Sequence, residues 1–460
     1  MTMPKGIAKS NAQRALSGMT GEAKSRYAYA NRAREETMKA AALVLSCLLC
    51  VPLAAQAADP LPRAKPESVG MSSERLALIR KQIDAEIARD QLPGAVLAIA
   101  RRGKLVHFEA YGYLDKAAGI PMRTDAIFSI ASMTKPMAAV AGLQLYEQGR
   151  LLMDEPLAKY FPKFANMQVA VLDAKKETIV DRVPVARKIT IQDLYRHTSS
   201  LIYGGRGTTA VHKLLPEGSG VAADTMTGAQ FLDHLSAQPL LYQPGSTWDY
   251  GFGLDVLGLI VEAQTEQSLG RYLQESVWKP LGMEDTHFVV PADKVARYAK
   301  ALPTDPETGR PQTMRLLTEP KKFECGGGCT ASTASDYLRF ASMLLNKGGL
   351  NEARVLGRKT VEYMTSNQLA PDVKSLLATT GDPTRGDYGF GLGVAVRTTP
   401  GIVRMLGSVG DFSWPGASGT NWWVDPREEL VVVWMAHSPG SVRWKYRQMV
   451  NALVYQSLID

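Results

Sequence analysis

The stretch Ser132-Met133-Thr134-Lys135 stands directly before an apolar run, Ala138 to Leu145, that is typical of a buried helix. A serine and a lysine three residues apart on a helix lie on the same side, one turn from each other. If the serine opens the helix, its hydroxyl also lies at the positive end of the helix dipole. The stretch then brings together a nucleophile, an amine that can accept its proton, and backbone N–H groups that can hold an oxyanion. It therefore indicates acyl transfer through a covalent serine ester.

A second Ser-x-x-Lys occurs at Ser276-Val277-Trp278-Lys279, in a different context. It closes a helix-like stretch and runs into Pro280-Leu281-Gly282, so Ser276 is expected near a C-terminal helix end. The helix dipole disfavours a developing negative charge there. Ser132, by contrast, follows the strand- and turn-like residues 126–131 and precedes a helix. We therefore predict that Ser132 is the reactive serine and that Ser276 is a chance match.

Residues 38–57 have the pattern of a secretory signal peptide. A basic start precedes a mostly apolar run from Ala40 to Leu53, which is too short to span a membrane, and Ala55-Gln56-Ala57 supplies a small-residue cleavage site. Residues 1–37 form an upstream leader that we do not expect to be native. Lipid attachment at Cys47 is an alternative with a shorter apolar region. We expect a periplasmic or secreted protein without a membrane span in the mature chain.

Removal of that segment changes the charge balance. Residues 1–57 hold eight of the 53 Lys and Arg and three of the 45 Asp and Glu, so 45 basic and 42 acidic residues remain. The formal charge falls from +8 to +3. No dense basic stretch with interleaved aromatic residues remains, so we predict no nucleic-acid partner. With 45% hydrophobic and 21% charged residues, the chain has an ordinary globular composition.

The mature part keeps one close cysteine pair, in Cys325-Gly326-Gly327-Gly328-Cys329. Three glycines make such a tight loop feasible, and an oxidising compartment permits a disulfide. Two free thiols are the alternative. The six histidines are scattered and none forms a metal-ligand spacing, so we predict neither a metal site nor a cofactor.

Strand-like and helix-like patterns at both ends of the mature chain predict its architecture. Residues 72–89 have the pattern of an amphipathic helix capped by Ser72 or Ser73. The further predicted elements are strands at 94–100, 105–111, 421–424 and 430–435 and a final helix at 443–458. Strands at both ends around a helical middle predict an antiparallel sheet closed by both ends of the chain. We expect an α/β domain of residues 58–155 and 300–460, with a helical domain of residues 156–299 inserted.

Two further loops carry candidate site residues. The turn-rich loop 244–253 delivers Tyr250, which could share a proton with Lys135 if the loop folds over Ser132. A half-buried loop tyrosine is the alternative. The loop 412–420 is rich in small residues, so the N–H of Ala417 could point at an oxyanion beside the N–H of Ser132.

In the same loop, Trp414 would form a wall of the acyl pocket, with ordinary core packing as the alternative.

Taken in order, Ser132-x-x-Lys135, Tyr250 and Trp414-x-Gly416 resemble the three motifs of the serine β-lactamase and penicillin-binding superfamily. The chain is most similar to its esterase branch, the family VIII carboxylesterases that resemble class C β-lactamases. The resemblance implies an α+β, β-lactamase/DD-peptidase-like fold, an antiparallel sheet flanked by helices with a mainly helical insertion. It also implies that Ser132 is the nucleophile and that Lys135 and Tyr250 act together as the general base. The Ser132 and Ala417 N–H groups would form the oxyanion hole.

Two connecting segments agree with this resemblance, and the motifs together cover essentially all of residues 60–460. Residues 189–201, Ile-Thr-Ile-Gln-Asp-Leu-Tyr-Arg-His-Thr-Ser-Ser-Leu, are similar to a stretch of the family that ends in His-Thr-Ser-Gly-Leu. Ser200 stands where the family usually has glycine. Residues 280–286, Pro-Leu-Gly-Met-Glu-Asp-Thr, are similar to a second family stretch.

The chain also departs from the β-lactamase pattern at two motifs. Phe252 occupies the usual asparagine position of the tyrosine motif, and Trp414-Pro415-Gly416 replaces Lys-Thr-Gly. The ammonium and hydroxyl that would hold a β-lactam carboxylate are both missing, so we expect weak recognition of anionic ligands. Recognition of a neutral ester or amide does not require these two groups, so we expect it to be unaffected. Trp414, Gly416, Phe252 and Tyr203 are the candidate substrate-contacting residues, with a plain loop position as the alternative for Tyr203.

These observations predict a serine hydrolase that cleaves small, short-acyl carboxylic esters through an acyl-enzyme on Ser132. One alternative keeps this chemistry but changes the substrate to amides, D-amino-acid peptides or β-lactams. Another, of a different class, is a non-catalytic, penicillin-binding-like protein that only binds a ligand. No serine lies in Gly-x-Ser-x-Gly, which argues against an α/β-hydrolase triad. The expected partner is a small-molecule ester or amide.

Overall fold

An antiparallel sheet of eight strands joins the two ends of the unit Asp59–Asp460, in the order β12-β13-β14-β15-β16-β1-β2-β3. The structure is a computed structural model, and it describes residues 18–30, 32–33, 59–312, 314 and 316–460. The strands are β1 (Gly94–Arg101), β2 (Lys104–Asp115), β3 (Ile120–Pro121), β12 (Gly389–Phe390), β13 (Ala395–Val396), β14 (Phe412–Ser413), β15 (Asn421–Asp425) and β16 (Leu430–Ala436). The predicted fold class is therefore confirmed, with β1 antiparallel to both β2 and β16.

Contacts divide the chain into two units, Met1–Ala58 and Asp59–Asp460. In the first unit the described residues 21–30 are helical. The predicted signal peptide, 38–57, lies outside the described residues. In the part of the chain that the structure describes, no helix has the length and apolar character needed to cross a bilayer. The predicted domain boundaries at 155 and 299 stay predictions.

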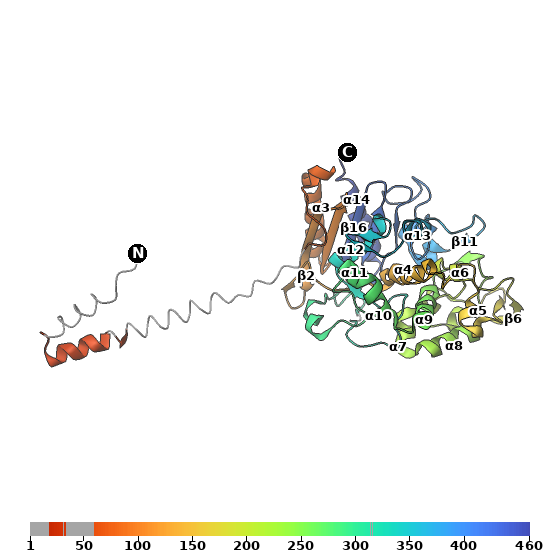
Figure 1. The fold of residues 1–460 in the computed structure, drawn as a ribbon, viewed down its shortest axis with the longest axis horizontal. Coiled ribbons are helices and arrows are strands. Elements are labelled where there is room, and N and C mark those ends of the chain that lie inside the picture. Colours follow the sequence, from red (N-terminus) through yellow and green to blue (C-terminus); the bar gives the residue numbers. More distant parts are fainter. Residues whose placement is uncertain (1–17, 31, 34–58, 313, 315) are drawn as a thin grey trace. The chain divides into compact units, whose positions relative to one another are not determined.

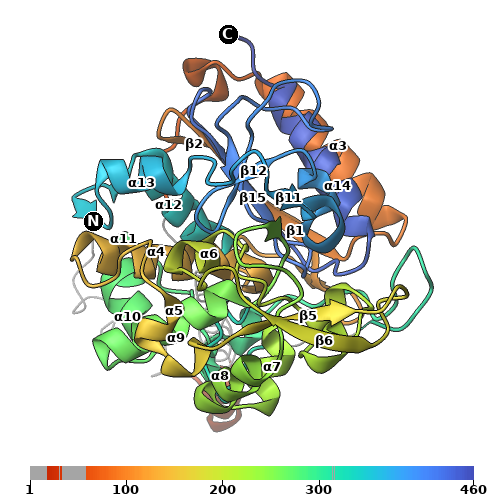
Figure 2. The same cartoon turned by 90° about the vertical axis from the view of Figure 1, so that its right-hand side faces the viewer.

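Strand β1 is buried on both faces, which explains its nearly continuous apolar sequence. Its side chains alternate between two hydrophobic clusters, because successive residues of a strand point to opposite faces. Ala95, Leu97 and Ile99 face the cluster formed with α3 (Ser73–Ala88) and α14 (Val442–Tyr455). Figure 2 shows these two helices side by side against the sheet. Ser72 caps α3 by accepting a hydrogen bond from the Arg75 N–H, as its sequence predicts.

The opposite face of the sheet packs against α12 (Ala334–Leu345), which contacts β1, β15 and β16. Beyond it lies α4 (Thr134–Glu147), which packs against α9 (Gly253–Thr265) and α10 (Leu269–Leu273). The remaining α-helices of this unit are α5 (Leu157–Tyr160), α6 (Ile191–Tyr195), α7 (Ser219–Thr225), α8 (Gly228–Ala237), α11 (Lys279–Leu281) and α13 (Arg358–Met364). Figure 1 shows α5, α7, α8, α9 and α10 gathered in its yellow and green part.

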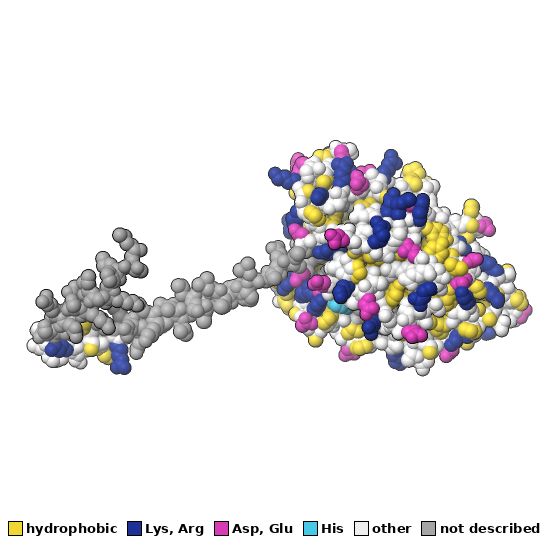
Figure 3. Space-filling view, in the orientation of Figure 1, with side chains coloured by type: hydrophobic (Ala, Val, Ile, Leu, Met, Phe, Trp, Pro, Cys, Tyr) yellow, Lys and Arg dark blue, Asp and Glu magenta, His cyan; other side chains and the backbone are white. Residues whose placement is uncertain are grey.

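Several short two-stranded pairs lie outside the eight-stranded sheet. They are β4 (Phe128–Ser129) with β8 (Ala331–Ser332), β5 (Gln168–Leu172) with β6 (Ile179–Pro184), β7 (Thr247–Trp248) with β11 (Lys374–Ser375), and β9 (Gly349–Leu350) with β10 (Ala353–Arg354). β4 leads directly into the turn before α4, so its pairing with β8 anchors the start of that helix. On the face drawn in Figure 3, basic and acidic side chains are interspersed.

Candidate active site

Ser132 lies in a short 3-10 turn, Ala131–Met133, that leads into α4. The serine therefore precedes the α-helix by one turn and does not open it. Ala131 adopts φ 45°, a left-handed conformation that non-glycine residues rarely take. Thr134 stabilises the turn, because its Oγ1 donates to the Ala131 carbonyl over 2.7 Å and lies 2.7 Å from Thr330 Oγ1. Ser132 stays partly exposed while the residues that follow it are buried.

Lys135 is fully buried beneath this turn. Its Nζ donates hydrogen bonds to the Gly327 carbonyl oxygen, at 2.5 Å, and to Tyr203 Oη, at 2.9 Å. Among the described residues, no hydrogen bond joins Lys135 Nζ to Ser132 Oγ. Catalytic hydrogen bonds are often long in a free enzyme and tighten only when substrate binds. The structure thus shows the Lys135 amine fixed by one backbone and one side-chain acceptor.

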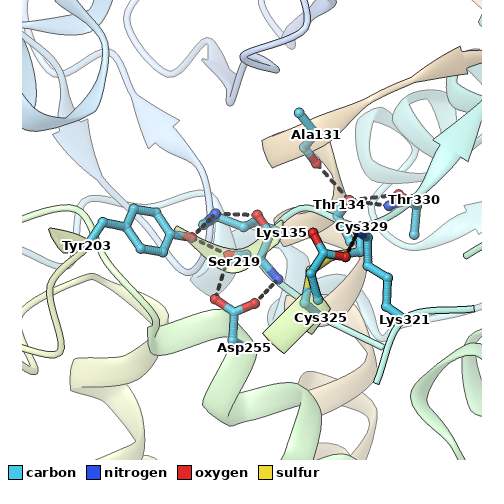
Figure 4. Close-up of a disulfide and its surroundings, with 12 residues drawn as sticks. Ala131, Thr134, Lys135, Tyr203, Ser219, Asp255, Lys321, Cys325, Cys329 and Thr330 are labelled. Atoms are coloured by element: carbon cyan, nitrogen blue, oxygen red, sulfur yellow. Dashed lines mark hydrogen bonds and ion pairs between the residues drawn. A yellow bond between two sulfur atoms is a disulfide. The ribbon is translucent and has the colours of Figure 1, made fainter. Parts of the chain in front are cut away.

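A buried carboxylate supports those partners (Figure 4). Asp255 Oδ2 accepts a hydrogen bond from Ser219 Oγ at 2.8 Å, and Ser219 Oγ lies 2.6 Å from Tyr203 Oη. Asp255 Oδ1 accepts the Gly327 N–H at 2.9 Å. Burial raises the pKa of Asp255, and the charge of Lys135 opposes that shift. Through these hydrogen bonds the buried Asp255 side chain orients both groups bonded to Lys135.

A disulfide between Cys325 and Cys329 closes the loop that carries Gly327. A side chain at Gly327 would collide with Ser219 Oγ and with the carboxylate of Asp255. Glycine is therefore required at this position, because the loop backbone approaches both groups directly. Figure 4 shows the loop beside Lys135.

Tyr250 packs edge-on against Tyr203, with the ring centres 5.1 Å apart, and its own ring centre lies 4.6 Å from Lys135 Nζ. Its Oη accepts a hydrogen bond from Trp414 Nε1 at 3.0 Å. His197 packs edge-on against the Tyr250 ring, with the ring centres 4.8 Å apart. Burial lowers the pKa of His197 well below its ordinary value, and the charge of Lys135 adds to this effect. A neutral His197 imidazole therefore packs against the Tyr250 ring, where its role is structural.

One pocket collects Ser132, Tyr250, Trp414 and Ala417. Gly416 shapes it, because a side chain there would collide with Thr420 Oγ1 and with the carbonyl of Ile130. The backbone can therefore come close to the turn that carries Ser132 only with glycine at this position. Among the described residues, the Ala417 N–H donates to no backbone or side-chain acceptor, so it is available to an oxyanion.

Two predicted substrate-contacting residues lie elsewhere. Tyr203 accepts a hydrogen bond from Lys135 Nζ, and Phe252 packs edge-on against Tyr203 with the ring centres 4.6 Å apart. Neither lines the pocket that holds Ser132. Ser276 does not line this pocket either. Its hydroxyl donates to the Tyr272 carbonyl at 2.7 Å within a helical segment.

The structure also explains the serine that replaces a family glycine. Ser200 has φ 61°, in the left-handed region that favours glycine. Its Oγ accepts the N–H groups of Leu241, at 3.0 Å, and Tyr242, at 2.9 Å. These two hydrogen bonds compensate for the backbone strain of a residue with a Cβ.

Four charged residues that sequence reasoning missed line the same pocket: Arg206, Asp382, Arg443 and Arg447. Arg447 binds Asp382 and donates to the Gly416 carbonyl at 2.6 Å. Arg443 and Arg447 lie four residues apart in α14, on one helix face. That spacing was visible in the sequence, but nothing local indicated which surface the face would meet. In the described part of the chain, no group of three or more His, Cys, Asp or Glu side chains is arranged to hold a metal ion.

Comparisons with known proteins agree with this geometry. A family model described as Beta-lactamase matches residues 79–456. The chain is 37% identical over 379 residues to Protein Rv1367c of Mycobacterium tuberculosis, covering 79% of this chain and 89% of that protein. It is 30% identical over 380 residues to Esterase EstB of Burkholderia gladioli, covering 77% and 88%.

A solved structure described as EstCE1, a hydrolase with promiscuous acyltransferase activity, superposes with a TM-score of 0.67. The sequence identity is 24%, over 83% of this chain and 99% of that one. At this identity the likeness shows the shared fold alone.

Proposed function

The chain belongs to the beta-lactamase family and is a hydrolase of the serine β-lactamase fold, and on that premise we propose that it is a carboxylesterase acting on short-acyl esters. The observation that carries the proposal is the pocket in which Ser132, Tyr250 and Ala417 meet, with the buried Lys135 Nζ 4.6 Å from the Tyr250 ring centre. EstB, an esterase by name, supports the ester as substrate.

In the proposed mechanism, Ser132 Oγ attacks the ester carbonyl carbon and its proton passes to the Lys135–Tyr250 pair. The N–H groups of Ser132 and Ala417 stabilise the oxyanion of the tetrahedral intermediate. Collapse expels the alcohol, which takes up the proton, and leaves an acyl group on Ser132 Oγ. Water, activated by the same pair, then hydrolyses the acyl-enzyme and restores the serine.

The environment of Tyr250 favours this role. Trp414 Nε1 donates to Tyr250 Oη, so it orients the phenol at the edge of the pocket. Trp414 therefore orients a residue of the proposed general base, at the position where the β-lactamase motif has a lysine.

We also propose that the protein is exported after removal of the segment 38–57. The disulfide between Cys325 and Cys329 supports this, because disulfides persist mainly in oxidising compartments.

The proposal is tested by hydrolysis of p-nitrophenyl butyrate and of nitrocefin, a β-lactam, side by side. Wild type is compared with Ser132→Ala, and Ser276→Ala serves as the matched serine control. We expect ester turnover that disappears in Ser132→Ala and persists in Ser276→Ala, with little nitrocefin cleavage. Nitrocefin cleavage that is faster than ester cleavage would indicate that the protein is a β-lactamase and not an esterase. Ester turnover that survives Ser132→Ala would overturn the mechanism.

A further inference from the structure

Two arginines from distant segments meet beside Ser132. Arg206 ends a short 3-10 turn, Gly204–Arg206, and its guanidinium carbon lies 5.6 Å from the ring centre of Tyr250. Arg443 lies in the first turn of α14. Both side chains are half-buried, and both line the pocket that contains Ser132. Each guanidinium is thus positioned where a bound substrate would pass.

Neither arginine has a carboxylate partner among the described residues. Arg443 donates to the carbonyls of Pro439 and Gly440, the latter at 2.8 Å, and its guanidinium carbon lies 4.9 Å from a ring centre of Trp444. Burial lowers the pKa of Arg443, the charge of Asp382 opposes this shift, and the charge of Arg206 adds to it. The charge of the Arg206 guanidinium therefore acts on that of Arg443.

The acid in this pocket is already neutralised. Asp382 forms an ion pair with Arg447, and it also accepts the Thr384 N–H at 2.9 Å. Since Asp382 pairs with Arg447, Arg206 and Arg443 have no carboxylate in ion-pair contact among the described residues, and both lie at a partly desolvated surface. Like charges held close together cost free energy unless an anion binds between them.

We infer that Arg206 and Arg443 form an anion subsite, and that the preferred substrates are esters with a carboxylate on the acyl chain. The inference rests on the proposed esterase function and names its substrate class. A guanidinium presents paired N–H donors that match the two oxygens of a carboxylate. The pocket beside Ser132 encloses only about 20 Å³, about the room of one water molecule. It therefore has room for the reacting carbonyl group only, and the charged end of the acyl chain would reach the arginines that line the same pocket.

This subsite contradicts the expectation of weak anion recognition that the third motif suggested. Trp414-Pro415-Gly416 removes the usual ammonium and hydroxyl, which predicted weak recognition of anions. The positive charge is supplied instead from position 206 and from α14, outside the three motifs.

The test compares two esters of the same chain length, mono(4-nitrophenyl) adipate with a terminal carboxylate and 4-nitrophenyl hexanoate without one. Arg206→Gln, Arg443→Gln and the double variant are assayed with wild type. Arg271→Gln is the matched control, since its side chain is 69% exposed and pairs with Glu275. We expect the double variant to lose at least ~10-fold more kcat/KM on the adipate than on the hexanoate, mainly through KM. Equal losses on both esters would overturn the subsite.

A binding measurement keeps this outcome separate from the fate of the esterase proposal. Calorimetric titration of monomethyl adipate into Ser132→Ala protein requires no turnover. Binding that weakens at least ~10-fold when Arg206→Gln and Arg443→Gln are added would support the subsite even if neither nitrophenyl ester were cleaved. Absence of binding to Ser132→Ala protein, or binding that the arginine changes leave unaltered, would overturn it.

Discussion

Lys135 Nζ donates a hydrogen bond of 2.5 Å to the carbonyl oxygen of Gly327, the middle residue between the two disulfide-bonded cysteines. The N–H of the same glycine is held by Asp255 at 2.9 Å. The buried amine of Lys135, which we propose acts in the general base, is therefore positioned by a five-residue loop that a disulfide closes. A change in that loop is transmitted directly to Lys135.

Opening this loop should slow catalysis. We expect the double change Cys325→Ser with Cys329→Ser to lower kcat on p-nitrophenyl butyrate by ~10-fold with little change in KM, because Lys135 loses a fixed acceptor. Loss of so short a loop closure should also lower the free energy of unfolding by about 2 kcal/mol. Steady-state kinetics and urea unfolding measure the two effects. The control is dithiothreitol, which should slow wild type and leave the double variant unchanged. A reduced wild type with full kcat would contradict this role of the loop.

The two tyrosines whose rings lie beside Lys135 should differ in their importance for catalysis. Tyr250 lies in the pocket, so Tyr250→Phe should lower kcat/KM by at least ~10²-fold if its phenol transfers the proton. Tyr203→Phe removes one hydrogen bond to Lys135, and we expect a loss of about 10-fold. Ester hydrolysis by each variant, with folding checked by circular dichroism, measures the order. The reverse order would assign proton transfer to Tyr203.

Gly416 should tolerate no side chain. Gly416→Ala places a methyl group against Thr420 Oγ1 and the Ile130 carbonyl, so the backbone that carries the Ala417 N–H must shift. Since a lost oxyanion donor costs ~10²-fold or more, we expect kcat to fall by that factor. The matched control is Gly220→Ala in α7, where the new methyl group meets no atom within 4 Å. A Gly416→Ala protein with wild-type kcat would exclude Ala417 from the oxyanion hole.

Asp249, directly before Tyr250, should make stability depend on pH. Burial raises the pKa of Asp249 to about 6, from an ordinary value of 3.8. The folded state thus binds this proton more tightly than the unfolded state, so its contribution to stability is lost as pH rises from about 4 through 6.

We expect wild type to lose about 2 kcal/mol relative to Asp249→Asn between about pH 4 and about pH 7, measured by urea unfolding. Asp84→Asn, at a side chain that is 52% exposed, is the control. A pH-independent difference between wild type and Asp249→Asn would contradict the raised pKa.

Local patterns were sufficient to predict the elements of the sheet domain. The apolar runs of β1 and β16 and the capped, amphipathic α3 all form near their predicted positions. The final helix, predicted at 443–458, spans Val442–Tyr455. The predicted superfamily is also confirmed by the family match over residues 79–456. Such features depend on periodicity and capping, which neighbouring residues determine.

The start of α4 shows where local patterns were insufficient. The sequence predicts Ser132 as the helix opener, but a left-handed Ala131 places it in a 3-10 turn ahead of Thr134. That conformation depends on tertiary contacts, among them the bond between Thr134 and Thr330, which lie far apart in the chain. Propensity alone cannot indicate a strained residue that distant contacts stabilise.

The sequence by itself determined the fold family, the order of its strands and helices at both ends, and the serine, lysine and tyrosine motifs, because these depend on spacing within short segments. Only the tertiary structure decided that Gly327 and Asp255 support Lys135, and that Arg206 and Arg443 meet beside Ser132. These groups come from segments separated by many residues. Their distances depend on how whole layers pack, and no local pattern contains that information.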